Sequence, residues 1–283
     1  MPHEFIADNN GVLTEAGQPY LFASNRSFRY GDGLFESIRV VNGKPFNMEH
    51  HVARLKEGMA ALRIDIPPHY TTDYFTKKAG ELITANAVSQ GGRIRLSVYR
   101  DSDGFYNPLS NDAGYCMEIT PQLNNLFELN EDGLSVDLYM EIRKPVNKLS
   151  IYKTCNSINY ILAALWAKQN KLDDALLIND KGNIIEASSS NLFIVCNGVL
   201  YTPALTDGCL AGVMRMQIIN IALENKIKVY ECSLTPQNLL VADEVFLTSA
   251  VKGLQWIVSY KMKRYTNTLT RSLLEKLNQY ANR

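Results

Sequence analysis

Two Asn-Gly pairs that follow apolar runs constrain the fold of this chain more than any other feature. Asn42-Gly43 comes after the run at residues 34–41, and Asn197-Gly198 comes after the run at residues 191–196. Asn-Gly between strand-like runs is typical of a tight hairpin turn, because both residues tolerate a positive φ. A β-hairpin is therefore predicted in each half of the chain.

Helical and extended patterns alternate around these hairpins. Residues 48–62 carry apolar side chains at helical spacing, and residues 93–99 alternate like a strand. Further strands are expected at residues 4–7, 114–120, 134–142, 174–178, 184–186 and 244–248, and helices at 70–87, 157–170, 212–224 and 271–280. The pattern predicts an α+β fold with a small α+β domain at residues 1–120, a linker at 121–132 and a larger α/β domain at 133–283.

Composition excludes several classes of function. Lys plus Arg and Asp plus Glu both number 29, so nothing in the charge favours nucleic acid or an anionic membrane as a partner. The longest apolar stretch, residues 158–167, is about half the length of a membrane helix. Residues 1–11 lack a signal-peptide pattern, and five widely spaced cysteines without C-x-x-C fit reduced thiols. We expect a cytoplasmic protein.

Metal, triad and dinucleotide chemistry are also disfavoured. The four histidines all lie at or before residue 69, none belongs to H-E-x-x-H, and no metal site is expected. G-x-S-x-G is absent. Gly31 and Gly33 begin a G-x-G pattern that lacks its third glycine.

Four other positions have the character of cofactor-binding residues. Lys153 lies in an apolar context before an expected helix, where a desolvated amine can form a Schiff base; the alternative is a surface lysine. Glu186 ends an apolar strand, where its carboxylate could bind a cationic ring nitrogen; the alternative is an exposed glutamate at the end of a strand. Gly212 precedes an apolar helix whose first amides suit a phosphate. Arg54 lies on an expected helix, where its guanidinium could bind a phosphate; the alternative is an ordinary surface arginine.

In this order along the chain, these segments resemble the class IV aminotransferases, also called fold-type IV pyridoxal phosphate enzymes. The resemblance covers about residues 5–260. The matching segments are Tyr30-Gly-Asp-Gly-Leu-Phe-Glu-Ser-Ile-Arg39, Glu49-His-His-Val-Ala-Arg54-Leu, Lys153-Thr-Cys-Asn156, Asp174-Ala-Leu-Leu-Ile-Asn, Glu186 through Asn191-Leu-Phe, Leu210-Ala-Gly-Val-Met-Arg215 and Ala242-Asp-Glu-Val-Phe-Leu-Thr-Ser-Ala250. The resemblance implies a two-domain fold like that of the D-amino-acid and branched-chain aminotransferases, with pyridoxal 5′-phosphate at the interdomain cleft.

The resemblance also implies roles for residues. Lys153 is similar to the family's catalytic Schiff-base lysine, and Glu186 to the partner of the pyridine nitrogen. The remaining expected cofactor ligands lie around the phosphate (Arg54, Gly212, Val213, Met214, Ser249, Ala250) or the ring (Ser189, Ser190, Asn191, Leu210). Substrate contacts are expected from Tyr30, Phe35, Arg39, Arg93 and Arg95.

Two departures from the family pattern bear on the substrate. Arg93 stands where branched-chain enzymes have a tyrosine, and with Arg95 it places two guanidiniums on one strand face, which favours an acidic substrate unless one arginine is structural. Ser157 stands where many relatives have a tyrosine, and the next tyrosine, Tyr160, comes a helical turn later. The second departure disfavours a branched-chain assignment.

The expected function is therefore transfer of an amino group from an L-amino acid, branched-chain-like or acidic, to a 2-oxo acid by a ping-pong Schiff-base mechanism. A homodimer is implied. An aminodeoxychorismate lyase that releases p-aminobenzoate and pyruvate is the alternative, although lyases tend to carry threonines where Glu36 and Ser37 stand. A D-amino-acid enzyme would need an Arg-x-His that is absent near residues 99–106. A non-catalytic relative would not need Lys153, Glu186 and Arg54 together.

Overall fold

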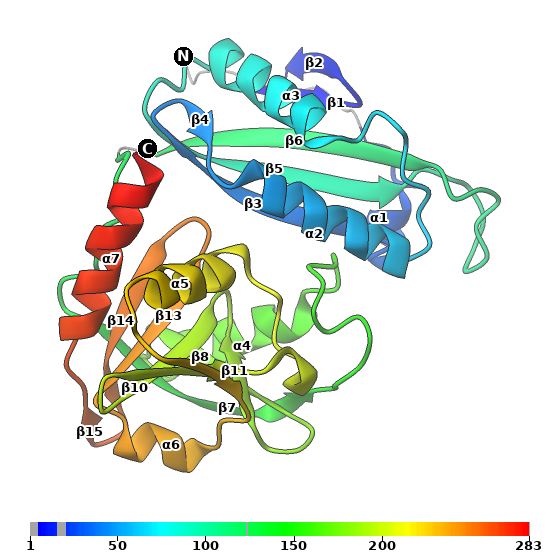
Figure 1. Ribbon diagram of the computed structural model, residues 1–283. Coiled ribbons are helices and arrows are strands. Elements are labelled where there is room, and N and C mark those ends of the chain that lie inside the picture. The colour runs from blue at the N-terminus through cyan, green and yellow to red at the C-terminus, as the bar shows by residue number, and fades with distance from the viewer. Residues whose placement is uncertain (1–4, 16–20, 123, 283) are drawn as a thin grey trace. The chain divides into compact units, whose positions relative to one another are not determined.

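The computed structural model describes residues 5–15, 21–122 and 124–282 and divides into two compact units (Figure 1). The first unit comprises Met1–Leu126 and Tyr152–Asn156, and the second comprises Phe127–Ile151 and Ser157–Arg283. The short segment that carries Lys153 thus packs with the first unit, although it lies beyond residue 133, where the larger domain was predicted to begin.

An antiparallel sheet with two long helices on one face forms the first unit. The strands run in the order β2-β1-β6-β5-β3-β4. They are β1 (Ile6–Asn9), β2 (Val12–Glu15), β3 (Gly33–Val41), β4 (Lys44–Pro45), β5 (Gly91–Arg100) and β6 (Ala113–Gln122). The helices are α1 (Arg26–Tyr30), α2 (Met48–Ala61) and α3 (Thr72–Ala85). The predicted hairpin is confirmed, with positive φ at Asn42 and Gly43 between β3 and β4.

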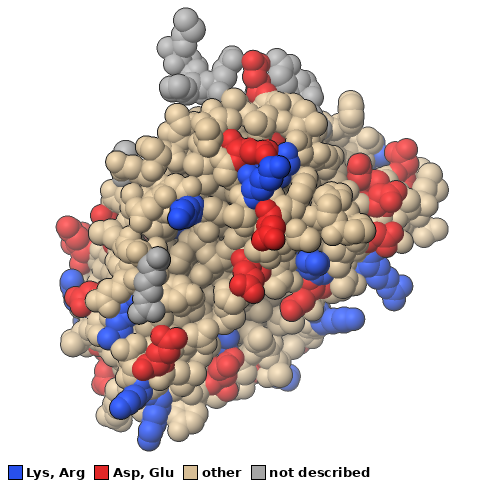
Figure 2. All heavy atoms as spheres, turned by 45° about the horizontal axis from the view of Figure 1, so that its top comes forward, with Lys and Arg blue, Asp and Glu red and all other residues tan. Residues whose placement is uncertain are grey.

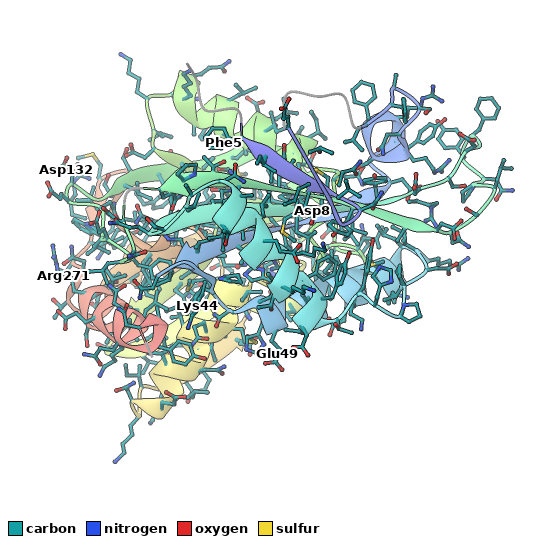
Figure 3. All side chains as sticks on the ribbon, turned by 90° about the horizontal axis from the view of Figure 1, so that it is seen from above. Phe5, Asp8, Lys44, Glu49, Asp132 and Arg271 are labelled. Atoms are coloured by element: carbon teal, nitrogen blue, oxygen red, sulfur yellow. The ribbon has the colours of Figure 1, made fainter. Side chains whose placement is uncertain are left out.

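Alternation along β5 gives this sheet two different faces. Ile94, Leu96 and Val98 are fully buried in one core cluster with apolar residues of α2 and α3. Each such side chain contributes roughly 1.5–3 kcal/mol when it leaves water. Arg93 and Arg95 project from the opposite face, because successive strand residues point to opposite sides. Glu49 in the first turn of α2, labelled in Figure 3, complements the positive end of that helix.

A closed ring of strands forms the second unit. The path β10-β13-β14-β7-β8-β9 returns to β10 through one residue pair, Asn191 opposite Glu186, and β11 and β12 extend it beyond β10. The strands are β7 (Leu134–Lys144), β8 (Asp174–Asn179), β9 (Ile184–Ala187), β10 (Asn191–Cys196), β11 (Val199–Pro203), β12 (Val229–Cys232), β13 (Glu244–Ser249), β14 (Gly253–Tyr260) and β15 (Lys263–Arg264).

Helices cover the outside of this ring. They are α4 (Ile158–Gln169), α5 (Val213–Glu224) and α7 (Thr268–Ala281), and a short 3₁₀ turn η1 (Leu205–Asp207) follows β11. The short helix α6 (Pro236–Val241) instead packs Leu239 into the core cluster formed by the inward-facing side chains of the strands. Figure 1 shows α5 and α7 beside β13 and β14. Because both faces of β10 and β13 are covered, these strands are almost continuously apolar, and Phe193 and Phe246 stack with ring centroids 5.1 Å apart.

The predicted α+β class is confirmed, and the helix and strand types match at most of the predicted segments. The second predicted hairpin is also confirmed, because β10 and β11 pair across Asn197 and Gly198, both at positive φ. The sequence does not predict α1, β2, β12, α6, β14 and β15. The strand predicted at residues 4–7 begins at Ile6, and residue 4 lies outside the described residues. Within the described chain, no helix is long and apolar enough to cross a membrane. On the face drawn in Figure 2, acidic and basic side chains are interspersed.

Candidate active site

Glu186 lies at the centre of a buried polar group in the second unit. Its Oε1 accepts from Lys144 Nζ at 2.6 Å and from the Tyr160 hydroxyl at 2.9 Å, and its Oε2 accepts from the Leu210 amide at 2.9 Å. Lys144 also donates to the carbonyl of Ser150. Burial raises the pKa of the Tyr160 hydroxyl, with the nearby Glu186 carboxylate acting in the same direction, so Tyr160 stays a hydrogen-bond donor.

The strand pairing that closes the ring brings further predicted residues to Glu186. Asn191 lies directly opposite it, and Asn191 Nδ2 donates to the Leu210 carbonyl at 2.8 Å. Ser189 and Ser190 form the turn between β9 and β10, where the Ser190 carbonyl accepts from the Ala187 amide. Residues from distant parts of the sequence, among them Lys144, Asn191 and Leu210, thus surround the Glu186 carboxylate.

The start of α5 lies next to this group. A Cβ on Gly212 would stand 1.9 Å from Asn191 Oδ1, so glycine is required by close packing. Gly212 caps α5 without a side-chain hydrogen bond, and the first amides of the helix, at Val213 and Met214, have no partner within the helix. Such amides suit a phosphate.

The end of β13 adds hydroxyl groups to the same unit. Thr248 pairs with Asn191 in the ladder, and its buried Oγ1 has no hydrogen-bond partner among the described residues. Ser249 Oγ accepts from the Lys252 amide at 3.2 Å, which forms the turn that contains Ala250. An unsatisfied buried hydroxyl beside a turn of this kind fits a polar ligand.

Lys153 belongs to the first unit through its main chain. Its carbonyl accepts from the Phe35 amide at 2.9 Å, and the Cys155 amide donates to the Gly33 carbonyl. The Phe35 ring contacts two cations, with Lys153 Nζ at 4.3 Å and Arg95 Cζ at 3.9 Å from its centroid. An amine, a guanidinium and an aromatic ring are therefore grouped on one strand face.

Arg54 lies in a buried network with Glu36 and His51. Arg54 Nε donates to Glu36 Oε1 at 2.8 Å, Arg54 Nη2 donates to Glu36 Oε2, and His51 Nδ1 contacts Glu36 Oε2 at 2.7 Å. Burial raises the pKa of the Glu36 carboxyl, but Arg54 and His51 outweigh burial and lower it to about 2. Burial lowers the pKa of His51. The predicted phosphate ligand is thus held in place by a carboxylate.

The remaining predicted substrate residues have distinct surroundings. Tyr30 ends α1, and its ring lies 5.5 Å from that of Tyr106. Arg39 donates to the side chain of Gln122 and to the carbonyls of Asn124 and Leu126. Arg93 has a long hydrogen bond of 3.5 Å to Ser37 Oγ.

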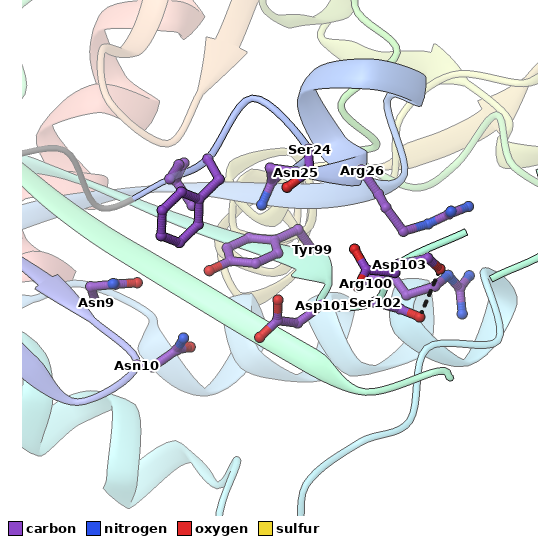
Figure 4. Close-up of a pocket in the computed structure, with 12 residues that line it drawn as sticks. Asn9, Asn10, Ser24, Asn25, Arg26, Tyr99, Arg100, Asp101, Ser102 and Asp103 are labelled. Carbon is purple, nitrogen blue, oxygen red and sulfur yellow. Dashed lines mark hydrogen bonds between the residues drawn. The ribbon is translucent and has the colours of Figure 1, made fainter. Parts of the chain in front are cut away.

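A polar cavity of about 380 Å³ also opens in the first unit (Figure 4). Its lining includes Asn9, Asn10, Tyr99 and Asp101 and contains none of the predicted site residues. Lys153 is not among the residues that line this cavity.

The chain belongs to the class IV aminotransferase family, whose model matches residues 33–260. It is 31% identical over 275 residues to a candidate branched-chain-amino-acid aminotransferase of Methanocaldococcus jannaschii, covering 95% of this chain and 93% of that protein. It is 29% identical to a D-alanine aminotransferase of Bacillus licheniformis, covering 85% and 83%.

Solved structures agree with this membership. The branched-chain aminotransferase of Thermoproteus uzoniensis with norvaline has a TM-score of 0.89 at 25% identity, covering 98% of this chain and 94% of that one. A candidate 4-amino-4-deoxychorismate lyase of Legionella pneumophila has a TM-score of 0.84 at 26% identity, covering 93% and 96%. The predicted fold type is therefore confirmed, and the chain is a class IV aminotransferase enzyme.

This family depends on pyridoxal phosphate, and solved branched-chain aminotransferases of this fold contain it or pyridoxamine 5′-phosphate. The donor set fits such a group. The second unit offers uncapped amides at the start of α5, the orphaned Thr248 hydroxyl and a buried carboxylate, and the first unit offers an amine at Lys153.

Lys144 and Tyr160 were missed as members of the Glu186 group. Lys144 ends a strand directly before Pro145, where lysines are usually exposed, so no sequence signal pointed to its burial. In the sequence Tyr160 stands out only as a tyrosine displaced from the family's position, and its place in the first turn of α4 brings its hydroxyl to Glu186.

Proposed function

We propose that the chain transfers an amino group from an L-amino acid, branched-chain-like or acidic, to a 2-oxo acid. One observation carries this proposal: the Lys153 amine and the Arg95 guanidinium both contact the Phe35 ring. An α-amino acid has an amino group and a carboxylate. The Lys153 amine suits the chemistry at the amino group, and the Arg95 guanidinium suits binding of the carboxylate.

Pyridoxal phosphate, when bound, supplies an aldehyde that accepts amino groups and a ring that stabilises negative charge on the reacting carbon. In this proposal Lys153 Nζ would hold the cofactor through its aldehyde, and as a free amine it would carry the proton that leaves the α-carbon of the amino acid. The Glu186 carboxylate, oriented by Lys144, Tyr160 and Leu210, would accept a hydrogen bond from the ring nitrogen and keep that nitrogen protonated. Arg54 and the first amides of α5 bind the phosphate.

A lyase that acts on aminodeoxychorismate is the second candidate. The similarity to the candidate lyase of Legionella pneumophila supports it. Glu36 favours the transaminase over the lyase. Both of its carboxylate oxygens accept hydrogen bonds from Arg54, and the threonine that lyases tend to carry at this position would offer only one oxygen.

We also propose a homodimer in the cytoplasm. Three aromatic side chains are largely exposed: Phe28 of α1 at 82%, and Phe105 and Tyr106 of the loop between β5 and β6 at 82% and 90%. Arg26 donates hydrogen bonds to the carbonyls of Gly104 and Phe105 and so holds this loop in place. Exposed aromatic groups of this kind favour association. The five free cysteines fit a reducing compartment. Sedimentation at several concentrations tests the dimer.

Absorbance spectroscopy of the purified protein tests the enzymatic proposal. The wild type is expected to show a cofactor band near neutral pH that one L-amino acid bleaches and a 2-oxo acid restores, whereas the D-enantiomer leaves the band unchanged. Lys153→Ala should lose the half-reaction, and the exposed Lys148→Ala serves as its control. Pyruvate release from aminodeoxychorismate, without bleaching by any amino acid, would favour the lyase.

A further inference from the structure

We propose that Asn197 is a site of spontaneous deamidation, and that the fold protects the chain's other Asn-Gly pairs from the same reaction. The chain contains three such pairs, Asn10-Gly11, Asn42-Gly43 and Asn197-Gly198, and all three lie within the described residues. The proposed transaminase function uses none of them. Because the reacting groups are the same in each pair, the surroundings of each turn decide how readily it reacts.

Deamidation at an Asn-Gly pair needs only water as a co-reactant. The main-chain nitrogen of the glycine attacks Cγ of the asparagine and closes an imide ring. The bond from Cγ to Nδ2 breaks, and Nδ2 leaves as ammonia with the proton of the attacking nitrogen. Water then opens the ring. Opening at Cγ gives aspartate, whereas opening at the main-chain carbonyl gives isoaspartate, in which the chain runs through the side chain. Glycine favours the attack because no Cβ stands beside its nitrogen.

The turn between β10 and β11 (Figure 1) leaves the attacking nitrogen free. Asn197 and Gly198 are both exposed, and the Gly198 amide donates to no acceptor in the described parts of the chain. Apart from its chain neighbours, no atom lies within 4 Å of the place that a Cβ on Gly198 would take. The side-chain amide of Asn197 has one weak contact, from Nδ2 to Cys196 Sγ at 3.7 Å. Neither reacting group is therefore held away from the other.

The Asn10-Gly11 turn is followed by valine, as the Asn197-Gly198 turn is, but its groups are bonded elsewhere. The Gly11 amide donates to Asp8 Oδ1 at 2.7 Å, and Asn10 Oδ1 accepts from the Tyr115 amide at 2.6 Å. A hydrogen bond to a carboxylate must break before this nitrogen can attack, which slows the reaction.

The Asn42-Gly43 turn is intermediate. Its glycine amide donates to the Gln90 carbonyl at 3.3 Å, which is longer than most N–H···O bonds. Asn42 is exposed, whereas Gly43 is partly buried. We therefore expect deamidation to be fastest at Asn197, slower at Asn42 and slowest at Asn10.

Both products should weaken the hairpin of β10 and β11. The Asn197 amide donates to Asp243 Oδ2 at 2.7 Å, so a carboxylate on residue 197 adds a second negative charge beside Asp243. Isoaspartate lengthens the main chain of a turn across which Cys196 and Val199 pair directly. Because turn length fixes the register of a hairpin, isoaspartate disturbs this pairing.

Peptide mass spectrometry of the wild-type protein tests the inference. The folded protein is incubated at mildly alkaline pH, and the deamidated fraction at each Asn-Gly pair is followed with time. Asn10 should react roughly 10- to 100-fold more slowly than Asn197, the factor that a hydrogen bond to a charged group provides. In urea the two should react at similar rates, because both precede Gly-Val. Equal rates in the folded protein, or a difference that persists in urea, overturn the inference.

Thermal unfolding tests the effect on the hairpin. Asn197→Asp reproduces one product and should unfold at a lower temperature than the wild type, and Asp243→Asn in that background should remove the difference. Asn42→Asp is the matched control in the other hairpin, where the amide of residue 42 donates to the neutral Asn125 side chain, and it should change the unfolding temperature less. Equal shifts in Asn197→Asp and Asn42→Asp would contradict the role of Asp243.

Discussion

The ammonium of Lys144 lies 2.6 Å from Oε1 of Glu186, and both side chains are buried in the second unit. The Tyr160 hydroxyl donates to the same oxygen, and the Leu210 amide donates to the other. Donors on both oxygens fix the orientation of the carboxylate before any ligand binds, and the contribution of each donor can be measured separately.

Replacing Lys144 should destabilise the protein strongly. Lys144→Met leaves the Glu186 carboxylate buried without its cation, and breaking a buried pair in this way costs about 3–5 kcal/mol. Urea unfolding of the apoprotein measures the loss. The double variant Lys144→Met/Glu186→Gln should recover part of it, because no charge is then left unpaired. Additive losses in the double variant would contradict coupling between the two side chains.

A smaller effect is expected from Tyr160. Tyr160→Phe removes one hydrogen bond to a carboxylate that keeps two other donors, so the free energy of unfolding should fall by about 1–3 kcal/mol. Cofactor affinity, measured by fluorescence titration of the apoprotein, should fall with it. Tyr152→Phe, outside the Glu186 group, is the control, and equal effects of the two substitutions would argue against a role for Tyr160.

The Glu36 network predicts how stability depends on acid pH. The pKa of Glu36 is about 2 in the folded chain and 4.5 for an ordinary glutamate, so the unfolded chain binds more protons between these values. The stabilisation from this carboxylate is therefore complete above about pH 4.5 and is lost as the pH falls toward about 2. The linkage amounts to about 3 kcal/mol.

Urea unfolding at several acid pH values tests this dependence. Glu36→Gln should be less stable than the wild type at neutral pH and should lose less stability across the window. Glu57→Gln, an exposed glutamate on α2, serves as the control and should follow the wild type. Parallel curves for wild type and Glu36→Gln would refute the assignment.

Gly212 gives a steric prediction. The backbone there is ordinary, at φ −68°, but a Cβ would stand 1.9 Å from Asn191 Oδ1. Gly212→Ala should therefore displace Asn191 and cost about 1–3 kcal/mol, with weaker phosphate binding. Gly80→Ala, where a Cβ meets nothing within 4 Å, should stabilise helix α3 by about 0.5–1 kcal/mol. Inorganic phosphate titration and thermal unfolding distinguish the two variants.

Strong periodicity made much of the fold predictable. The helix predicted at residues 48–62 and the strand at 93–99 carry apolar residues at regular spacing, and α2 and β5 occupy them. The strand β14 and the short helix α6 could not be found in this way, because β14 has mixed side-chain patterns and α6 spans less than two turns. Their formation depends on pairing and packing with distant segments.

The site was predictable where a residue's chemistry is local and unpredictable where it depends on distant contacts. Glu186 and Gly212 belong to recognisable segments, and the structure places both beside Asn191, which pairs with Glu186 and packs against Gly212. Lys144 is 42 residues away from Glu186 in the sequence, and only the ladder of β7, β8 and β9 brings the two together. Arg54 was identified as a candidate, but its partner Glu36 lies on another element.

The closure of the β-ring through the single pair Asn191 and Glu186 has a dynamic consequence. Opening this seam breaks fewer main-chain hydrogen bonds than parting any longer ladder, so local breathing should concentrate there. A fluctuation that separates β9 from β10 disperses the groups around the carboxylate while the remaining strands stay paired. A ligand that binds only the closed arrangement would raise the free energy of opening as its concentration rises, so hydrogen exchange at this seam should slow when the ligand is added.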